Sequence, residues 1–382
     1  MSRFFDLVSK TARGVASGPQ APPSKSTQDE PQLIRLDSNE NPFGPSPRAV
    51  EAIRMALASA NLYPEDDCTE LKSRLSTVHD LPAEQVLVTA GSTGMLSLLC
   101  QTLLVPGLNA VTSERSFIVY SMAVHASGAD LIEAPMREDE IDLDAIQNAI
   151  NEHTRIVFLA NPNNPTGTMV DAAAVDKFLV EVPGHVVVVL DEAYYEFAAH
   201  LAARRGIEYS RSLSYVRQGA SVVVLKTFSK VHGLAGLRIG YGLGPAELMD
   251  YCARMQNTFS VSSVAQAAAI AALEDESHIA RTVAGNADQA QVLGVGLSDM
   301  GLRVVPTWAN FVYCDLGEDA APVAERLRGE GISVRPLGAW GAPQCIRVSI
   351  GRAEQNQKFL NAITKVGRFS AVSSAARKSF DH

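Results

Sequence analysis

Residues 185–197 read HVVVVLDEAYYEF, an apolar run that ends at two adjacent acids. A continuous β-branched run of this length is typical of a strand that is buried on both faces of a parallel sheet. Comparable runs recur along the chain, at 86–88, 129–132, 155–159 and 221–225. Stretches with helical periodicity, such as 142–150 and 171–182, separate most of them. The alternation predicts an α/β fold in which helices sandwich a mostly parallel sheet.

A second, smaller unit follows this alternation. Residues 246–290 are rich in alanine and have helical character, and the segments after them read as strands, namely RVVPTWANFVYCDL (303–316), ISVRPL (332–337) and CIRVSIG (345–351). A chain of 382 residues is also long for a single hydrophobic core. We therefore expect four parts: an N-terminal arm (1–32), a small α+β domain (33–60 plus 285–367), a large domain (61–284) and a C-terminal tail (368–382).

Local signals place two helix starts. Ser46 precedes a proline, which predicts a helix that begins there. Its apolar face should consist of Val50, Ile53 and Leu57. A second helix is expected to begin at Thr69 and to bury three side chains, those of Leu71, Leu75 and Val78.

The composition narrows the class of protein. Hydrophobic residues make up 46% of the chain and charged residues 20%, and the net charge is -9. This is ordinary for a soluble globular protein and unfavourable for general nucleic-acid binding. The five cysteines form no CxxC pair and the eight histidines form no HExxH motif, so we expect reduced thiols and no metal site.

Targeting and membrane signals are missing from the sequence. No apolar stretch approaches the ~18 residues that cross a bilayer, and the first 24 residues lack the long apolar core of a targeting peptide. We expect these 24 residues to be a mobile arm and residues 17–32 to form a linker. The expected location is the cytoplasm, with no membrane or nucleic-acid partner.

Ligands of such sheets bind beyond the carboxyl ends of the strands, so the residues that follow each strand are informative. Residues 89–94, TAGSTG, lead into a helix, where free backbone N–H groups suit either a phosphate or a simple N-cap. Residues 161–167, NPNNPTG, form either a structural turn or a polar rim for a ligand. Asp191 ends a buried strand, where a carboxylate usually meets a cation, with a helix N-cap as the alternative.

Lys230 follows the strand at 221–225 and is flanked by small hydroxyl residues. Burial near other cations lowers the pKa of a lysine and frees its amine as a nucleophile. Thr227, Ser229 and Arg238 are natural ligands of a phosphate. The strand ends thus supply a phosphate cradle, an acid, a phenol and an amine, which is the set of groups that pyridoxal 5'-phosphate (PLP) requires.

Seven motifs occur in order along the chain: SNENPFGPSP (38–47), LYPED (62–66), TAGST (89–93), NPNNPTG (161–167), LDEAYYEF (190–197), TFSKVHGLAGLRIGYGLG (227–244) and CIRVSIG (345–351). From about residue 33 to 366, the chain resembles the fold-type I, class I/II aminotransferases. Within that family it is most similar to the histidinol-phosphate aminotransferase branch. The resemblance implies a large PLP domain with a mostly parallel seven-stranded sheet and a smaller α+β domain.

The resemblance also implies residue roles around PLP. Lys230 holds the cofactor as a Schiff base and moves the proton, Asp191 pairs with the ring nitrogen, and Tyr194 and Asn164 bond the 3'-oxygen. Phe117 stacks on the ring face. The implied phosphate ligands are Ser92, Thr93, Thr227, Ser229 and Arg238.

Further implied roles concern the substrate and a second subunit. Tyr63 matches a tyrosine that reaches the cofactor of the neighbouring subunit, so the resemblance implies a homodimer with shared sites. Arg347 matches the arginine that clamps the substrate carboxylate or its equivalent, Arg335 matches a contact to a distal phosphate, and Asn41 is assigned to the substrate site. Trp308 is expected near the substrate, with a core tryptophan as the alternative.

The expected reaction is transamination of an amino acid or an amino-alcohol phosphate, with 2-oxoglutarate and glutamate as the exchanging pair. The segment 17–32 departs from the family, because it lacks the tyrosine that often precedes the first strand. A PLP-dependent decarboxylase, or a cyclising or oxidising enzyme on the same fold, is the alternative. A PLP-sensing domain of a regulator is a further, non-enzymatic alternative.

Overall fold

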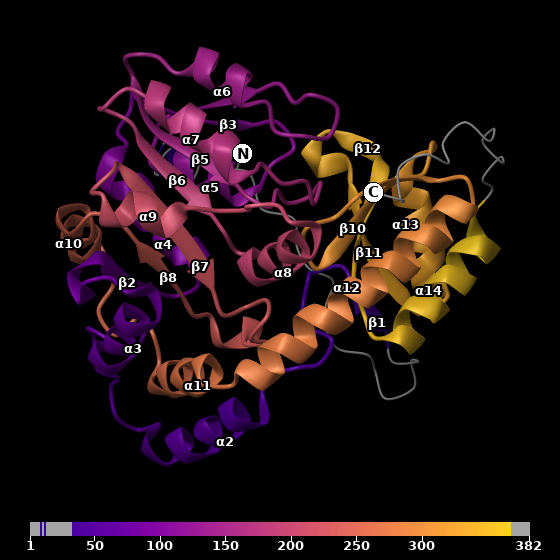
Figure 1. Ribbon diagram of the computed structural model, residues 1–382, viewed down its shortest axis with the longest axis horizontal. Helices are drawn as coiled ribbons and strands as arrows, with labels where there is room; N and C mark the ends of the chain where they lie inside the picture. The colour runs from indigo at the N-terminus through magenta and orange to yellow at the C-terminus, as the bar shows by residue number, and fades with distance from the viewer. Residues whose placement is uncertain (1–7, 10, 13–32, 368–382) are drawn as a thin grey trace.

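The computed structural model describes residues 8, 9, 11, 12 and 33–367 (Figure 1). Most of the predicted arm and all of the predicted tail at 368–382 therefore lie outside the described residues, as does the linker at 17–32. The described chain forms two β-sheets with helices packed around each of them.

The larger sheet has seven strands and is mostly parallel, which confirms the predicted fold class. In spatial order its strands are β2 (Val86–Thr89), β8 (Gly240–Leu243), β7 (Val222–Thr227), β6 (Val187–Asp191), β5 (Thr154–Ala160), β3 (Asn109–Ser113) and β4 (Asp130–Ala134). Only β8 runs antiparallel to its neighbours. The carboxyl ends of β5, β6 and β7 consequently meet at one edge, which positions the residues that follow them.

Both faces of this sheet are buried, as the continuous apolar runs predict. Along β6, Val188 and Leu190 pack into one core cluster and Val189 packs into another on the opposite face. The helices that contribute to the first cluster are α2 (Pro47–Ala56), α3 (Thr69–His79), α6 (Leu143–Ala149), α7 (Ala172–Glu181), α9 (Ser212–Arg217) and α11 (Ser263–Leu273). Those of the second are α4 (Ser92–Leu103), α5 (Val119–Ala126) and α10 (Ala246–Arg254).

The two predicted helix starts are confirmed. The Ser46 hydroxyl accepts a hydrogen bond from the backbone of Ala49 at 3.1 Å and caps α2. Helix α3 begins at Thr69 and buries Leu71 and Leu75.

Two of the side chains expected on buried helix faces are exposed, so those details were wrong. Val78 is 57% exposed, because the buried stripe of α3 continues from Leu75 to His79, whose ring lies 2.8 Å from the Tyr241 hydroxyl. Leu57 is also 57% exposed, because α2 ends at that residue.

The smaller sheet has five strands in the order β1 (Ile34–Leu36), β11 (Ile332–Leu337), β12 (Ala342–Ser349), β10 (Phe311–Asp315) and β9 (Arg303–Val305). Its core cluster includes side chains of α13 (Ala320–Gly329), α14 (Ala353–Val366) and the long helix α12 (Glu276–Asp299). In Figure 1, α12 runs from the larger sheet's side of the molecule to the smaller sheet. α12 also contacts α8 (Tyr195–Arg205), which directly follows β6.

The division into domains at 60/61 and 284/285 stays a prediction. The contacts add one detail: α2 packs along α11, and Ala49 belongs to the core of the larger sheet. None of the helices in the described residues is both long and apolar enough to cross a membrane.

Candidate functional site

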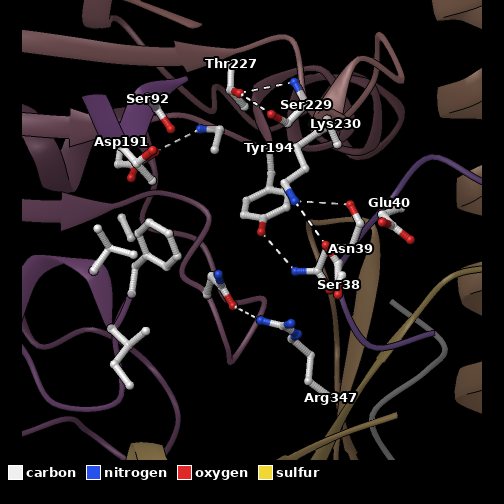
Figure 2. Close-up of a pocket in the computed structure, with 18 of the residues that line it drawn as sticks. Ser38, Asn39, Glu40, Ser92, Asp191, Tyr194, Thr227, Ser229, Lys230 and Arg347 are labelled. Carbon is white, nitrogen blue, oxygen red and sulfur yellow. Dashed lines mark hydrogen bonds between the residues drawn. The ribbon is translucent and has the colours of Figure 1, made fainter. Parts of the chain in front are cut away.

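A cavity of about 540 Å³ lies between the strand ends of the larger sheet and the smaller sheet. All but two of the predicted site residues line it, and Figure 2 shows a close-up of this pocket. The large sheet contributes the residues after β2, β5, β6 and β7, and the small sheet contributes Arg335 and Arg347 from β11 and β12. The segment after β1, from Asp37 to Glu40, closes the space between them.

Lys230 lies in the turn after β7 and its side chain extends into the cavity (Figure 2). Its Nζ lies 3.3 Å from the carbonyl oxygen of Ser38 and 3.2 Å from that of Asn39. The side chain is partly exposed to the cavity, yet burial and, to a smaller extent, the nearby Arg347 together lower the pKa of the Lys230 amine to about 7. At neutral pH a large share of this amine is therefore unprotonated and nucleophilic.

Asp191 is the last residue of β6 and is 5% exposed. One carboxylate oxygen, Oδ2, accepts a hydrogen bond from the Tyr120 hydroxyl at 2.9 Å, and Oδ1 accepts one from the backbone of Ala193 at 3.2 Å. Burial raises the pKa of Asp191 and these two hydrogen bonds oppose the rise, which leaves the pKa at about 6. A buried carboxylate held by two donors is suited to pair with a cation in the cavity.

An anion cradle forms where α4 begins. Arg238 reaches over this turn, with Nη2 at 3.3 Å from the Thr93 hydroxyl and Nη1 at 3.4 Å from the Ser229 hydroxyl. Gly91 has φ +77°, a backbone conformation that residues with a side chain rarely adopt, and a Cβ there would lie 2.6 Å from Arg238 Nη2. The Ser92 side chain and the helix N-terminus complete a donor set that suits a phosphate monoester.

A second group of contacts joins the two sheets across the cavity. The Tyr194 hydroxyl accepts a hydrogen bond from Asn39 Nδ2 at 2.9 Å. Arg347 donates through Nη1 to Asn164 Oδ1 at 2.5 Å and through Nη2 to the carbonyl of Asp37 at 2.8 Å. Burial lowers the pKa of Arg347 to about 10, so the guanidinium keeps its charge at neutral pH.

Arg335 and Arg347 face each other across the antiparallel pair β11–β12. Directly opposed residues of such a pair place their side chains on the same face of the sheet. The Nε of Arg335 donates to the carbonyl of Asp37 at 3.3 Å. One side of the cavity therefore presents two neighbouring guanidinium groups, which suits an anionic substrate group such as a carboxylate or a phosphate dianion.

Residues 31–363 match the family described as aminotransferase class I and II. The chain belongs to this aminotransferase family.

Relatives of this aminotransferase include histidinol-phosphate aminotransferase 2 of Pseudomonas fluorescens Pf-5, which is 43% identical over 338 residues, 88% of this chain and 90% of the relative. The histidinol-phosphate aminotransferase of Moorella thermoacetica is 40% identical over 87% of this chain and 85% of the relative. A similar solved structure is that of histidinol-phosphate aminotransferase from Sinorhizobium meliloti in complex with pyridoxal-5'-phosphate. It has a TM-score of 0.86 and 28% identity and covers 95% of this chain and 98% of the other.

Two predicted site residues of this aminotransferase lie outside the cavity. Tyr63 is 82% exposed, and its ring stacks on that of Phe259 with the centroids 4.6 Å apart. Asn41 donates through Nδ2 to the carbonyl of Val231 at 2.8 Å and accepts from the backbone of Phe43, so it fixes the loop and does not line the cavity. The asparagine of this segment that faces the cavity is Asn39.

The tryptophan near the substrate site of the aminotransferase is Trp340, and the expectation for Trp308 was wrong. Trp308 packs beside a separate small cluster that includes Tyr209, with Arg205 4.6 Å above its ring. Trp308 is half-buried, which is closer to the alternative of a core tryptophan than to a place at the substrate. Trp340 lines the cavity from the turn between β11 and β12.

Sequence reasoning also missed Tyr120, although a signal was available. Tyr120 lies in the first turn of α5, only three residues after Phe117, which the family resemblance assigns to the cofactor. The Tyr120 ring is fully buried, stacks on Phe158 at 4.7 Å and meets Phe117 edge-on at 5.6 Å. Tyr120 thus positions both the Asp191 carboxylate and the aromatic residue that lines the cavity.

Within the described part of the chain, no group of three His, Cys, Asp or Glu side chains could hold a metal ion.

Proposed function

We propose that this aminotransferase uses PLP and acts on histidinol phosphate, with glutamate and 2-oxoglutarate as the exchanging pair. Relatives at 40–43% identity over most of the chain carry the name histidinol-phosphate aminotransferase. The observation that carries the proposal is the placement of Lys230, whose amine has a pKa of about 7, in one cavity with the Asp191 carboxylate and the Arg238 cradle.

The groups present in the cavity fit PLP at its three recognition points. The phosphate would be held by Ser92, Thr93, Thr227, Ser229 and Arg238, in the cradle where a Cβ at position 91 would crowd Arg238 and Thr93. Asp191 would pair with the ring nitrogen, and Lys230 would meet the aldehyde. When bound, PLP supplies the electron sink for the bond changes at the donor Cα.

The chain's own residues then supply proton transfer and binding. A lysine with a pKa near 7 can both accept and return the proton at the donor Cα, because neither form is strongly favoured at neutral pH. Tyr194, held by Asn39, and Asn164, held by Arg347, would orient the ring oxygen.

Two arginines would bind the substrate from the small sheet. Histidinol phosphate has no carboxylate and carries its phosphate on the carbon next to the reacting carbon, so Arg347 and Arg335 would both pair with that phosphate. Both side chains line the same cavity as Lys230.

The proposal extends to a homodimer with shared sites. The end of α2 and the segment that joins it to α3 expose four large apolar side chains, namely Met55, Leu57, Leu62 and Tyr63. Exposed apolar surface of this kind favours burial against a second copy, where Tyr63 would reach the partner's cradle. Mixing Tyr63→Phe with Lys230→Ala protomers tests this, because only shared sites restore one complete site per heterodimer.

The cytoplasmic location stays a prediction.

An assay with histidinol phosphate and 2-oxoglutarate tests the proposed reaction, with the glutamate that forms as the measured product. Arg335→Ala should lower kcat/KM for histidinol phosphate by about 1.5–3 kcal/mol, roughly tenfold to a hundredfold, because a charged hydrogen bond is lost. Histidinol, which lacks the phosphate, is the matched donor and should lose much less. An unchanged kcat/KM for histidinol phosphate in the variant would contradict the proposal that Arg335 binds the substrate phosphate. Release of CO2 without glutamate formation identifies a decarboxylase instead.

A further inference from the structure

A second cavity adjoins the active-site cavity. It has a volume of about 490 Å³ and lies between the loop after β3, helix α5 and the turn between β11 and β12. Four residues line both cavities: Phe117, Ile118, Met122 and Trp340. Because residues that line two cavities lie between them, these four side chains form the wall that separates the second space from the active site.

The wall is built from two sides. Ile118 and Met122 are four residues apart at the start of α5, so they project from one face of that helix. Trp340 comes from the small sheet, in a one-turn 3-10 helix (Gly338–Trp340) that ends at Gly341 with φ +73°. Trp340 is thus the contribution of the small sheet to a wall that otherwise belongs to the large one.

The strand pairing explains why Trp340 lies there. Arg335 pairs with Arg347, but the register shifts after Pro336, and Leu337 pairs with Ala342. The shift turns the hairpin tip so that Trp340 packs partly against the cluster of Tyr313 and Leu337 while also lining both cavities. The same hairpin therefore carries both substrate-site arginines and the tryptophan next to them.

We infer that Trp340 determines how large a donor side chain the site accepts. Its indole lies between the active-site cavity and the second cavity and so limits the space on that side of the donor. Removing the indole joins the two spaces and opens room for a bulkier donor beyond Arg335. The choice of histidinol phosphate as the reference donor rests on the proposed function.

The test compares donors of different size in Trp340→Ala and Trp340→Phe. The ratio of kcat/KM for tryptophan to that for histidinol phosphate should rise by about tenfold or more in Trp340→Ala, with a smaller rise in Trp340→Phe. Trp308→Phe is the matched control, because it alters the only other tryptophan of the chain, outside the cavity. An unchanged ratio in a folded, cofactor-binding Trp340→Ala enzyme overturns the inference.

Fluorescence gives a readout that does not depend on turnover. Trp308→Phe retains Trp340 as its single tryptophan, and its emission should change when a donor binds to the holoenzyme. Trp340→Phe retains Trp308, whose emission should not change. The reverse pattern contradicts the placement of Trp340 at the donor.

Failure of the proposed function remains distinguishable from failure of the inference. If the wild-type enzyme does not turn over histidinol phosphate, the proposed donor is wrong. The ratio of kcat/KM for tryptophan as donor to kcat/KM for alanine as donor then tests the role of Trp340 alone. This ratio should still rise in Trp340→Ala. An unchanged tryptophan to alanine ratio overturns the role of Trp340 whatever the natural donor.

Discussion

Lys226 and Lys230 are separated by only three residues, yet their surroundings differ in kind. Lys226 lies on β7 with a side chain that is 5% exposed, and its Nζ is 3.2 Å from Glu192 Oε2 and 3.4 Å above the Tyr195 ring. Lys230 extends into the cavity and contacts backbone carbonyls, while Arg347 helps to lower its pKa. The Lys226 amine is paired with a carboxylate, whereas the Lys230 amine is available to react.

The adjacent acids Asp191 and Glu192 are divided between the two lysines. Glu192 is 2% exposed, contacts Lys226, and accepts hydrogen bonds from the hydroxyls of Ser210 at 2.5 Å and Ser212 at 3.0 Å. Asp191 faces the cavity and is held by Tyr120. Both lysines are largely buried, so the partner of each amine, more than its burial, determines whether that lysine is structural or reactive.

The largest expected effect separates the two lysines by activity. Lys230→Ala should lower the rate of transamination by about 10²–10⁴-fold or more, because the group that moves the proton is lost. Lys226→Met should lower the rate of the folded enzyme far less, since Lys226 does not line the cavity. Single-turnover kinetics at saturating PLP measure both. Equal losses in the two variants would remove the distinction.

Stability should show the opposite order. Lys226→Met leaves Glu192 buried without its cation, which should cost about 3–5 kcal/mol in the free energy of unfolding. The double variant Lys226→Met/Glu192→Gln should recover part of this loss, because the unpaired charge is gone. Lys230→Met serves as the control and should not destabilise the cofactor-free protein. Urea denaturation of the cofactor-free proteins provides the measurement, and an undiminished stability of Lys226→Met contradicts the structural role.

A smaller effect concerns the acid on the Lys230 side. Tyr120→Phe removes a hydrogen bond that lowers the pKa of Asp191, so this pKa should rise above its value of about 6. Because Asp191 must be ionised to pair with the ring nitrogen, the acid limb of the kcat/KM profile should move to higher pH. Tyr215→Phe is the matched control, since Tyr215 bonds Asp176 outside the cavity. A profile that shifts equally in both variants rules out the specific role of Tyr120.

Much of the fold was predictable because the central strands carry strong local signals. Each of β5, β6 and β7 contains an uninterrupted apolar run, since both faces of these strands are buried. β3, with the sequence NAVTS, and β8, with GYGL, were not identified individually, because their residues are polar or small and tertiary pairing alone holds them as strands.

The candidate site was predictable where a residue follows a strand directly, as Asp191 and Lys230 do. It was less so where the chain folds back from a distance. Asn39 and Asn41 lie in one short motif, and only the loop conformation decides which of them faces the cavity. Trp340 reaches the site through a register shift between β11 and β12 that no local pattern announces.

Borohydride treatment of the PLP-loaded protein tests the central claim most directly, because it makes the link between a lysine amine and an aldehyde permanent. Peptide mapping by mass spectrometry should find the cofactor on Lys230 and an unmodified Lys226. In Lys230→Ala, no lysine should carry the cofactor under the same conditions. Attachment to Lys226, or to any other lysine of the wild-type chain, would contradict the assignment of Lys230 as the reactive amine.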